Sequence, residues 1–227
     1  MTTAAEAQPP GLEHLQLKDR VYQHLRQGII NGDYEIGVAL REVDIANRLG
    51  VSKTPVREAF VRLEKDRLVH LIPYRGATVA SYTATDLKEI YEVRQLVQGA
   101  CARRAARFSD ASDHQDLDAN LDATRVALAN GDVDTVIKLF DAFDQLIYKH
   151  SHNRWIDDLV RNLDGHQRRI GRLTVKIPGR MDRSLGQHVR IVEAIKARDE
   201  DAAEYEMRAH VASVMADQLA NFYPEQK

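Results

Sequence analysis

A group of cations and hydroxyls lies between Arg41 and Val69, in the segment REVDIANRLGVSKTPVREAFVRLEKDRLV. Such side chains suit DNA, because arginine and lysine pair with phosphates and guanine edges and hydroxyls hydrogen-bond the phosphate backbone. Arg57 is the strongest candidate for a forked contact to guanine or phosphate, since its donors are planar and fixed. The candidate DNA contacts are Arg41, Ser52, Lys53, Thr54, Arg57, Arg62, Arg75 and Gly76.

Two short helical patterns position these groups. The segment before Gly50 carries apolar residues at helical spacing, and the segment after it repeats that spacing from Val56 to Leu63. Gly50 stands where a helix needs a left-handed C-terminal residue, and Ser52 or Thr54 can cap the next helix. Pro55 is tolerated in the first turn, because its missing N–H has no partner there. The pattern predicts a helix-turn-helix with an exposed basic second helix.

Two short strands are predicted after the second helix, at Leu68–Leu71 and Ala77–Ala80. They flank a turn that would place Arg75 and Gly76 at the tip of a small wing, narrow enough to enter the minor groove. The alternative interpretation is an ordinary helical hairpin whose charged side chains are solvated.

The charge of the chain is unevenly distributed. Its 227 residues carry 32 Lys and Arg against 34 Asp and Glu, a net charge of −2. Between Leu17 and Ala80 there are 11 basic and 8 acidic residues, a balance of +3, so the remainder carries −5. The basic charge is therefore concentrated at the predicted DNA-binding end.

Some classes of protein are excluded by simple features of the sequence. The single Cys101 rules out an internal disulfide and a cysteine-based zinc cluster. No apolar run reaches the roughly 20 residues needed to cross a bilayer, and the N-terminus lacks a signal-peptide pattern. We therefore expect a cytoplasmic protein with no membrane partner.

The chain is predicted to have three parts. Residues 1–14 are low in apolar content and indicate a flexible N-terminal arm. Residues 15–81 would form a winged helix-turn-helix domain, whose first helix runs from Leu17 to Ile30. Residues 82–223 predict an all-α antiparallel helical bundle, so the fold is mainly α. The six predicted helices of the bundle lie at about Thr85–Phe108, Gln115–Asn130, Val133–His150, Arg154–Pro178, Asp182–Ala197 and Asp199–Phe222.

Both halves resemble known regulators. The run LGVSKTPVREAFVRLEKDRLV, followed by PYRGATV, resembles the winged helix-turn-helix of GntR-type transcription regulators. The runs YEVRQLVQGACARRAA, FDQLIYKHSHNRWIDDL and HVRIVEAIKARDEDAAEYEMRAHV resemble the FCD effector-binding domain of the FadR subfamily. Six helices in this half are similar to its VanR-type branch. The resemblance implies a homodimer that binds double-stranded DNA at a pseudo-palindromic operator, more often as a repressor, and responds to a small organic acid.

The resemblance also implies a possible divalent metal inside the bundle, held by an Asp, a His one turn later and two further His. His188 and His210 match the last two, whereas Phe140 stands at the Asp position and Asp144 at the first His position. The remaining ligands, Asp144, His188 and His210, would suit Zn, Ni or Mn with water completing the shell. The alternative is a metal-free, hydrogen-bonded polar cluster.

The implied effector site draws on the same region. Arg94 lies in the "EVR" of the resembling domain and could clamp a carboxylate, or form a salt bridge to a neighbouring helix. Tyr148 follows Asp144 by one turn, and His166 either points inward or is a satisfied core histidine. The candidate effector residues are Arg94, Asp144, Tyr148, His166, His188 and His210.

Two other functions compete with a ligand-responsive regulator. A helical metallohydrolase would use Asp144, His188 and His210 to activate water, but no motif supplies a further general base, so we do not expect an enzyme. A structural DNA-bridging protein without an effector would respond to no metabolite.

Overall fold

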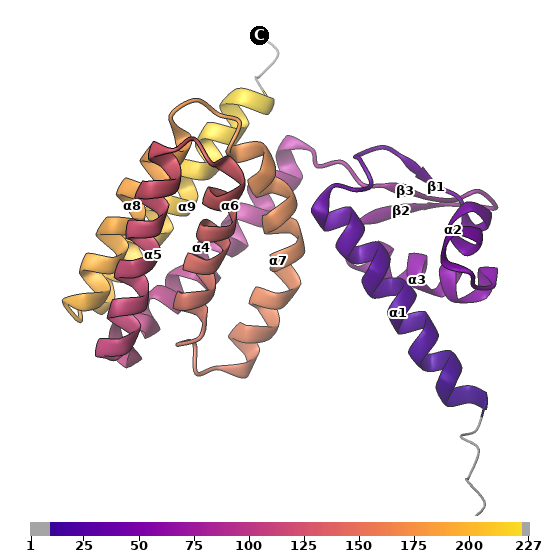
Figure 1. The fold of residues 1–227 in the computed structure, drawn as a ribbon, viewed down its shortest axis with the longest axis horizontal. Helices are drawn as coiled ribbons and strands as arrows, with labels where there is room; N and C mark the ends of the chain where they lie inside the picture. Colours follow the sequence, from indigo (N-terminus) through magenta and orange to yellow (C-terminus); the bar gives the residue numbers. More distant parts are fainter. Residues whose placement is uncertain (1–9, 224–227) are drawn as a thin grey trace, which may run out of the picture. The chain divides into compact units, whose positions relative to one another are not determined.

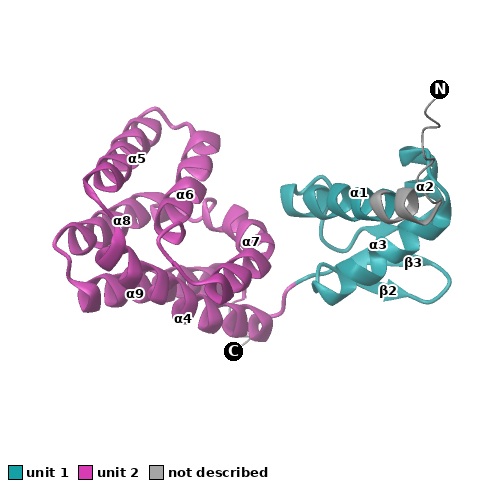
Figure 2. Ribbon diagram, turned by 90° about the horizontal axis from the view of Figure 1, so that it is seen from below, with its two compact units in different colours: residues 1–81 teal, residues 82–227 magenta. Residues whose placement is uncertain are grey.

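The computed structural model describes residues 10–223, with side chains described from residue 17. The chain divides into two units, residues 1–81 and 82–227, each with its own apolar core (Figure 2). Figure 1 shows that helices dominate both units and that strands are confined to the first within the described residues. The predicted mainly α fold, with a winged helix-turn-helix followed by a helical bundle, is confirmed.

The first unit begins with a long helix, α1 (Pro10–Asn31). A flexible arm was expected as far as His14, and this is wrong from Pro10 onward, where the backbone is already helical. Proline fits the first turn of a helix because its missing N–H would have no partner there. The rest of the expected arm, residues 1–9, lies outside the described residues.

The helix-turn-helix consists of α2 (Glu42–Leu49) and α3 (Lys53–Lys65). Gly50 ends α2 in the left-handed conformation, with φ 65° and ψ 34°, as predicted. Ser52 occupies the N-cap of α3 in an extended conformation, but its side chain makes no capping hydrogen bond. The fully buried Val56, Ala59, Phe60 and Leu63 seat α3 on the core of this unit.

The wing is a three-stranded antiparallel sheet in the order β1 (Ala39–Leu40), β3 (Gly76–Val79), β2 (Val69–Ile72). The two predicted strands are confirmed with slightly shifted ends. Strand β1 was not predicted, because two residues are too short to show an alternating pattern. It pairs with β3 through Ala39 opposite Thr78 and Leu40 opposite Ala77.

The second unit contains six helices within the described residues, as predicted. They are α4 (Ala84–Phe108), α5 (Ala111–Ala129), α6 (Val133–Tyr148), α7 (Arg154–Thr174), α8 (Arg180–Lys196) and α9 (Glu200–Phe222). Helix α5 starts earlier than expected, because Asp110 accepts hydrogen bonds from the backbone N–H groups of Ser112 and Asp113. Helix α4 packs most extensively against α9 and also contacts α6, α7 and α8, so it is central to the bundle (Figure 1).

Candidate functional site

The N-terminal half of α3 presents the predicted DNA-binding side chains to solvent. Ser52, Lys53, Thr54 and Arg57 are all exposed, on the side of the helix opposite its buried apolar face. Arg41, directly before α2, is exposed as well. The first turn of α3 also carries backbone N–H groups without intrahelical partners, which favour phosphate. This surface has the chemistry and the helical shape that the major groove accepts.

Arg57 is already held by a forked ion pair with Glu42, the first residue of α2. The Arg57 Nε–Glu42 Oε1 distance is 3.0 Å and the Nη2–Oε2 distance is 2.7 Å. The hydrogen bonds that Arg57 donates to Glu42 lower the pKa of Glu42 and raise the pKa of Arg57. Because the pair occupies Nε and one proton of Nη2, Nη1 remains directed away from Glu42 and can serve a DNA contact.

Arg62, another predicted DNA contact, is engaged by α1 in the structure. Its guanidinium lies over the ring of Tyr22, 3.9 Å from the centroid, and is ion-paired with Asp19. Both partners belong to α1, so Arg62 fixes the packing of α3 against α1. Five residues separate Arg62 from Arg57, which places the two side chains on different faces of the helix.

The two residues predicted at the tip of the wing differ in exposure. Arg75 is exposed in the turn, and its N–H donates to the carbonyl of Ile72 at 3.0 Å. Gly76 is buried in β3, where an added Cβ would lie 2.2 Å from the carbonyl oxygen of Leu40, so it is not available to DNA. Sequence reasoning missed Tyr74, which is wholly exposed at φ 62°. Its position after Pro73 in the turn was the signal that could have found it.

In the bundle, Arg94 is a buried cation without a carboxylate partner. Its side chain on α4 is only 6% exposed, and no ion pair to it occurs within the described residues. It lies over the ring of Tyr91, and Nη2 donates a long 3.5 Å hydrogen bond to Gln98, while Nε has no partner. The predicted alternative, a salt bridge to a neighbouring helix, therefore does not form. Burying an unpaired guanidinium is costly, so this position favours an anion.

A chain of amide and hydroxyl contacts connects Arg94 to Asp144, and we call these residues the Gln98 cluster: Arg94, Gln98, Asp144, Tyr148 and Gln167. Gln98 Nε2 donates to Gln167 Oε1 at 2.8 Å and to the hydroxyl of Tyr148. Gln167 Nε2 in turn donates to Asp144 Oδ2. Burial raises the pKa of Asp144 to about 7, so this carboxyl is readily protonated. The structure thus brings together three predicted effector residues.

The two histidines of the predicted metal site form an aromatic group. The ring of His188 is stacked on Phe143, with centroids 3.9 Å apart and planes at 2°. Phe140 and His210 meet it edge-on, at 5.0 and 4.8 Å. Burial, reinforced by Arg180, lowers the pKa of His188 to about 3, and burial also lowers that of His210. Both imidazoles are therefore neutral.

The predicted ligands do not fit a divalent metal. In the described part of the chain, no group of three or more His, Cys, Asp or Glu side chains is arranged to hold one. Asp144 is hydrogen-bonded to Gln167 in the Gln98 cluster, whereas His188 and His210 are bordered by Phe140 and Phe143. We therefore assign no chemistry to a metal at this site.

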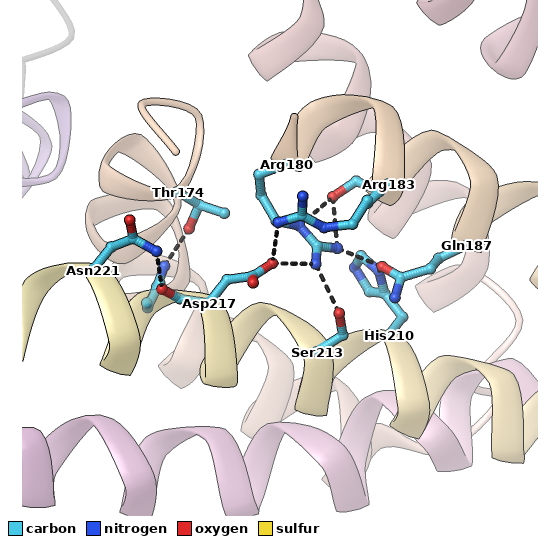
Figure 3. Close-up of polar contacts among 10 residues, drawn as sticks. Thr174, Arg180, Arg183, Gln187, His210, Ser213, Asp217 and Asn221 are labelled. Carbon is cyan, nitrogen blue, oxygen red and sulfur yellow. Dashed lines mark hydrogen bonds and ion pairs between the residues drawn. The ribbon is translucent and has the colours of Figure 1, made fainter. Parts of the chain in front are cut away.

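Arg180, which sequence reasoning missed, lies beside these histidines with no exposed surface. Figure 3 shows its guanidinium surrounded by side chains of α8 and α9. It donates to Ser184, Gln187, Ser213 and Asp217, with the Asp217 contact at 2.9 Å. Its N–H groups are thus satisfied, unlike those of Arg94. An arginine directly after Pro178-Gly179 would normally be expected at the surface, so the sequence carries no signal for its burial.

Gln187 connects Arg180 to His210. Its Oε1 accepts from Arg180 and lies 2.9 Å from His210 Nδ1. Because an amide oxygen can only accept, Nδ1 of His210 carries the proton and Nε2 holds the lone pair. His210 is therefore fixed in one tautomer (Figure 3).

His166, predicted as an effector residue, is instead hydrogen-bonded to Tyr82 at the start of the second unit. The Tyr82 hydroxyl lies 2.7 Å from His166 Nδ1 and accepts from Arg169 at 3.2 Å. The carbonyl of Tyr82 accepts from the hydroxyl of Tyr223 at 2.7 Å. Helix α7 and Tyr223, the C-cap residue of α9, thus hold the residue with which the second unit begins.

Comparison with known proteins matches each of the two units to a protein family. Residues 17–79 match the family described as bacterial regulatory proteins, gntR family, and residues 89–213 match the FCD domain. In the part of the chain that the structure describes, every helix is too short or too polar to cross a membrane.

Individual relatives cover most of the chain. An uncharacterized HTH-type transcriptional regulator of Bacillus subtilis, YdhC, is 32% identical over 83% of this chain and 85% of its own length. The galactonate operon transcriptional repressor of Escherichia coli is 27% identical over 88% of this chain and 95% of its own. The crystal structure of a GntR transcriptional regulator from Rhodococcus sp. RHA1 is 27% identical, with a TM-score of 0.71, over 90% of this chain and 98% of that one.

Proposed function

Because the chain belongs to the GntR family of bacterial transcription regulators and carries an FCD domain, we propose that it is a repressor released from DNA by a small organic acid. The family consists of DNA-binding regulators and not enzymes, which sets aside the metallohydrolase alternative. We further propose that it works in the cytoplasm as a homodimer on a pseudo-palindromic operator, since two-fold protein symmetry imposes matching half-sites.

The exposed face of α3 supports the DNA-binding part of the proposal. Lys53, Thr54 and Arg57 are anchored by a fully buried apolar face, so the groups that would meet base edges and phosphates are held rigidly. The Glu42 pair fixes the direction of the Arg57 fork before DNA arrives. Little ordering entropy would then remain to oppose binding at this residue.

The unpaired Arg94 is the observation that carries the effector part. A carboxylate beside its guanidinium would supply a directly paired counter-charge, whereas Asp144 is linked to Arg94 through Gln98 and Gln167 and is readily protonated. Hydroxyl or carbonyl groups of the ligand could extend toward Gln98 and Gln167. The relative named as the galactonate operon repressor supports this class, because galactonate is a hydroxy acid. Such a ligand shifts operator affinity only by its different affinities for the DNA-competent and incompetent states.

The test of DNA binding compares Arg57→Ala with Arg20→Ala, which removes an exposed arginine from α1. The operator would be selected with wild-type protein from a pool of random duplexes. We expect Arg57→Ala to weaken operator binding by about 10-fold or more, in line with roughly 1–3 kcal/mol for a specific base contact. Arg20→Ala should bind as the wild type does. Gel shifts must share one salt concentration, since phosphate contacts are screened, and equal affinity of both variants would refute the proposed role.

The test of effector binding is a thermal-shift screen with small carboxylates, including sugar acids. We expect at least one acid to raise the melting temperature of wild-type protein, and Arg94→Gln to abolish that rise while keeping the fold, because the amide removes the charge and keeps the polarity. A screen in which no acid stabilises the protein would favour the effector-free, DNA-bridging alternative. A rise that persists in Arg94→Gln would place the acid elsewhere.

A further inference from the structure

The side chains around His188 determine which metal-ligand atoms are available in this part of the bundle. One face of the imidazole is covered by Phe143 in parallel stacking, and Phe140 stands against its edge. Both phenylalanines lie on α6, one turn from each other, on the side from which that helix would have to supply a ligand. A phenyl ring has no lone pair to offer, so α6 contributes no donor next to His188.

The donors that remain are too few for a protein metal site. His210 offers the lone pair of Nε2, since its Nδ1 proton is directed to Gln187, and His188 offers one nitrogen. Structural sites use four protein ligands and catalytic sites use three. Asp144, the third residue expected to serve, accepts from Gln167 in the Gln98 cluster. Two neutral imidazoles beside two phenyl rings therefore fall short of either set.

The local charge also opposes a dication. Arg180 lies wholly buried beside His210 and is linked to it through Gln187 (Figure 3). Within the described residues its carboxylate partner is Asp217, which also pairs with Arg183. Arg94 adds a second buried positive charge without a carboxylate partner in the described part of the chain. A divalent ion placed here would add to this excess with no carboxylate of its own to neutralise it.

From these contacts we infer that the bundle works without a bound divalent metal: Phe140 takes the place from which a third ligand would come, and the effector is held by side chains alone. The statement about the effector rests on the proposed function, whereas the statement about the metal does not. An effector would then be selected by the charge of Arg94 and by single hydrogen bonds to groups such as His210 Nε2, and chelating ability would bring it no advantage.

The experiment measures metal binding directly on the full-length protein. Wild-type protein, freed of metal by chelator and exchanged into chelator-free buffer, is titrated with Zn²⁺, Ni²⁺ and Mn²⁺ salts in a calorimeter, and its metal content after gel filtration is measured by mass spectrometry. His188→Ala/His210→Ala protein reports binding by other histidines at the surface. We expect wild type and this double variant to retain the same, substoichiometric amount of each metal.

A gain-of-function variant tests the role assigned to Phe140. Phe140→Asp introduces a carboxylate beside His188, and we expect it to retain about one equivalent of Zn²⁺ or Ni²⁺, whereas Phe140→Leu should retain no more than the wild type. Far-UV circular dichroism checks that both variants fold. If folded Phe140→Asp gains no metal, Phe140 is not what excludes the ion.

The inference can be overturned without the Phe140 variants, even if these fail to fold. About one equivalent of metal that is lost in the His188→Ala/His210→Ala protein would overturn it. The metal measurements depend neither on DNA nor on an effector, so a failed operator experiment would not change their interpretation. For any acid found in the thermal-shift screen, the same rise in melting temperature with and without EDTA is expected, and a rise that EDTA removes would count against the inference.

Discussion

The imidazole of His188 lies flat on the ring of Phe143, and its burial lowers its pKa to about 3, against 6.5 in an unfolded chain. Between these two pH values His188 is protonated in the unfolded chain and neutral in the folded chain. The contribution to stability is therefore complete above pH 6.5 and is lost progressively as the pH falls toward 3.

This pH dependence can be measured with His188→Phe, which keeps an aromatic ring against Phe143 but cannot titrate. We expect wild type to lose about 2 kcal/mol more unfolding free energy than the variant between pH 6.5 and pH 4.5. Urea unfolding at both values, with a charge-neutral surface variant such as Gln145→Ala as control, provides the comparison. Parallel pH profiles for wild type and His188→Phe would mean that this imidazole is not held neutral.

The positions of some functional side chains could be predicted from residue type and spacing, and those of others could not. The exposed positions of Lys53, Thr54 and Arg57 followed from the apolar spacing of their helix, because that spacing fixes which face is buried. Arg62 and Arg180 could not be assigned in this way. An arginine next to an apolar face can equally reach DNA, an aromatic ring or a half-buried carboxylate, and only the packing of a distant helix decides between them.

At the scale of elements, the wing depends on a close approach of two strands. Gly76 has φ 103°, and a Cβ there would lie 2.2 Å from the Leu40 carbonyl oxygen and 3.2 Å from Arg41 Cα, both backbone atoms that cannot rotate away. Strand β1 would have to separate from β3 to accept a side chain. The glycine therefore serves the sheet and not the DNA.

We accordingly expect Gly76→Ala to destabilise the first unit by about 2–4 kcal/mol, since it combines a steric clash with a disfavoured backbone conformation. The matched control is Gly37→Ala, because Gly37 has φ 81° but nothing within 4 Å of an added Cβ, and its cost should stay near 1 kcal/mol. Urea unfolding followed by hydrogen exchange of the strand amides would measure both. Equal costs would show that β1 yields without penalty.

The ends of elements were harder to predict than the elements themselves. Six bundle helices could be read from apolar spacing, yet α5 begins at Ala111 and not at Gln115 because Asp110 and Asp113 cap each other's backbone. Likewise Thr83, with Asp86, starts α4. A capping side chain is one polar residue among many in a sequence, and it is identified only once the backbone turns there. Strand β1 was missed for a related reason, since its pairing partner is 37 residues further on, from Leu40 to Ala77.

At the scale of the molecule, the two units have separate apolar cores. Phe60 lies in the first and Phe143 in the second, both without exposed surface. Each substitution to alanine should cost about 3–5 kcal/mol through lost burial and a cavity. We expect Phe60→Ala to lower only the stability of the first unit and Phe143→Ala only that of the second.

The single Trp155, on α7, reports on the second unit by fluorescence, and exchange of the β2 and β3 amides reports on the first. Phe60→Ala should therefore leave the denaturation midpoint of the fluorescence signal unchanged. Midpoints that move together for both probes would show that the units unfold as one.

The contacts of Tyr82 have a consequence for the connection between the units. The N–H of Ala80 is bonded to the carbonyl of Leu68, and Ala80 is buried in the first unit. Tyr82 is held by α7 and α9 in the second. Only the exposed Ser81 lies between these two anchored residues. The connection between the units is thus a single residue and not a long flexible linker. Any reorientation of one unit against the other must therefore change the few main-chain torsion angles around Ser81.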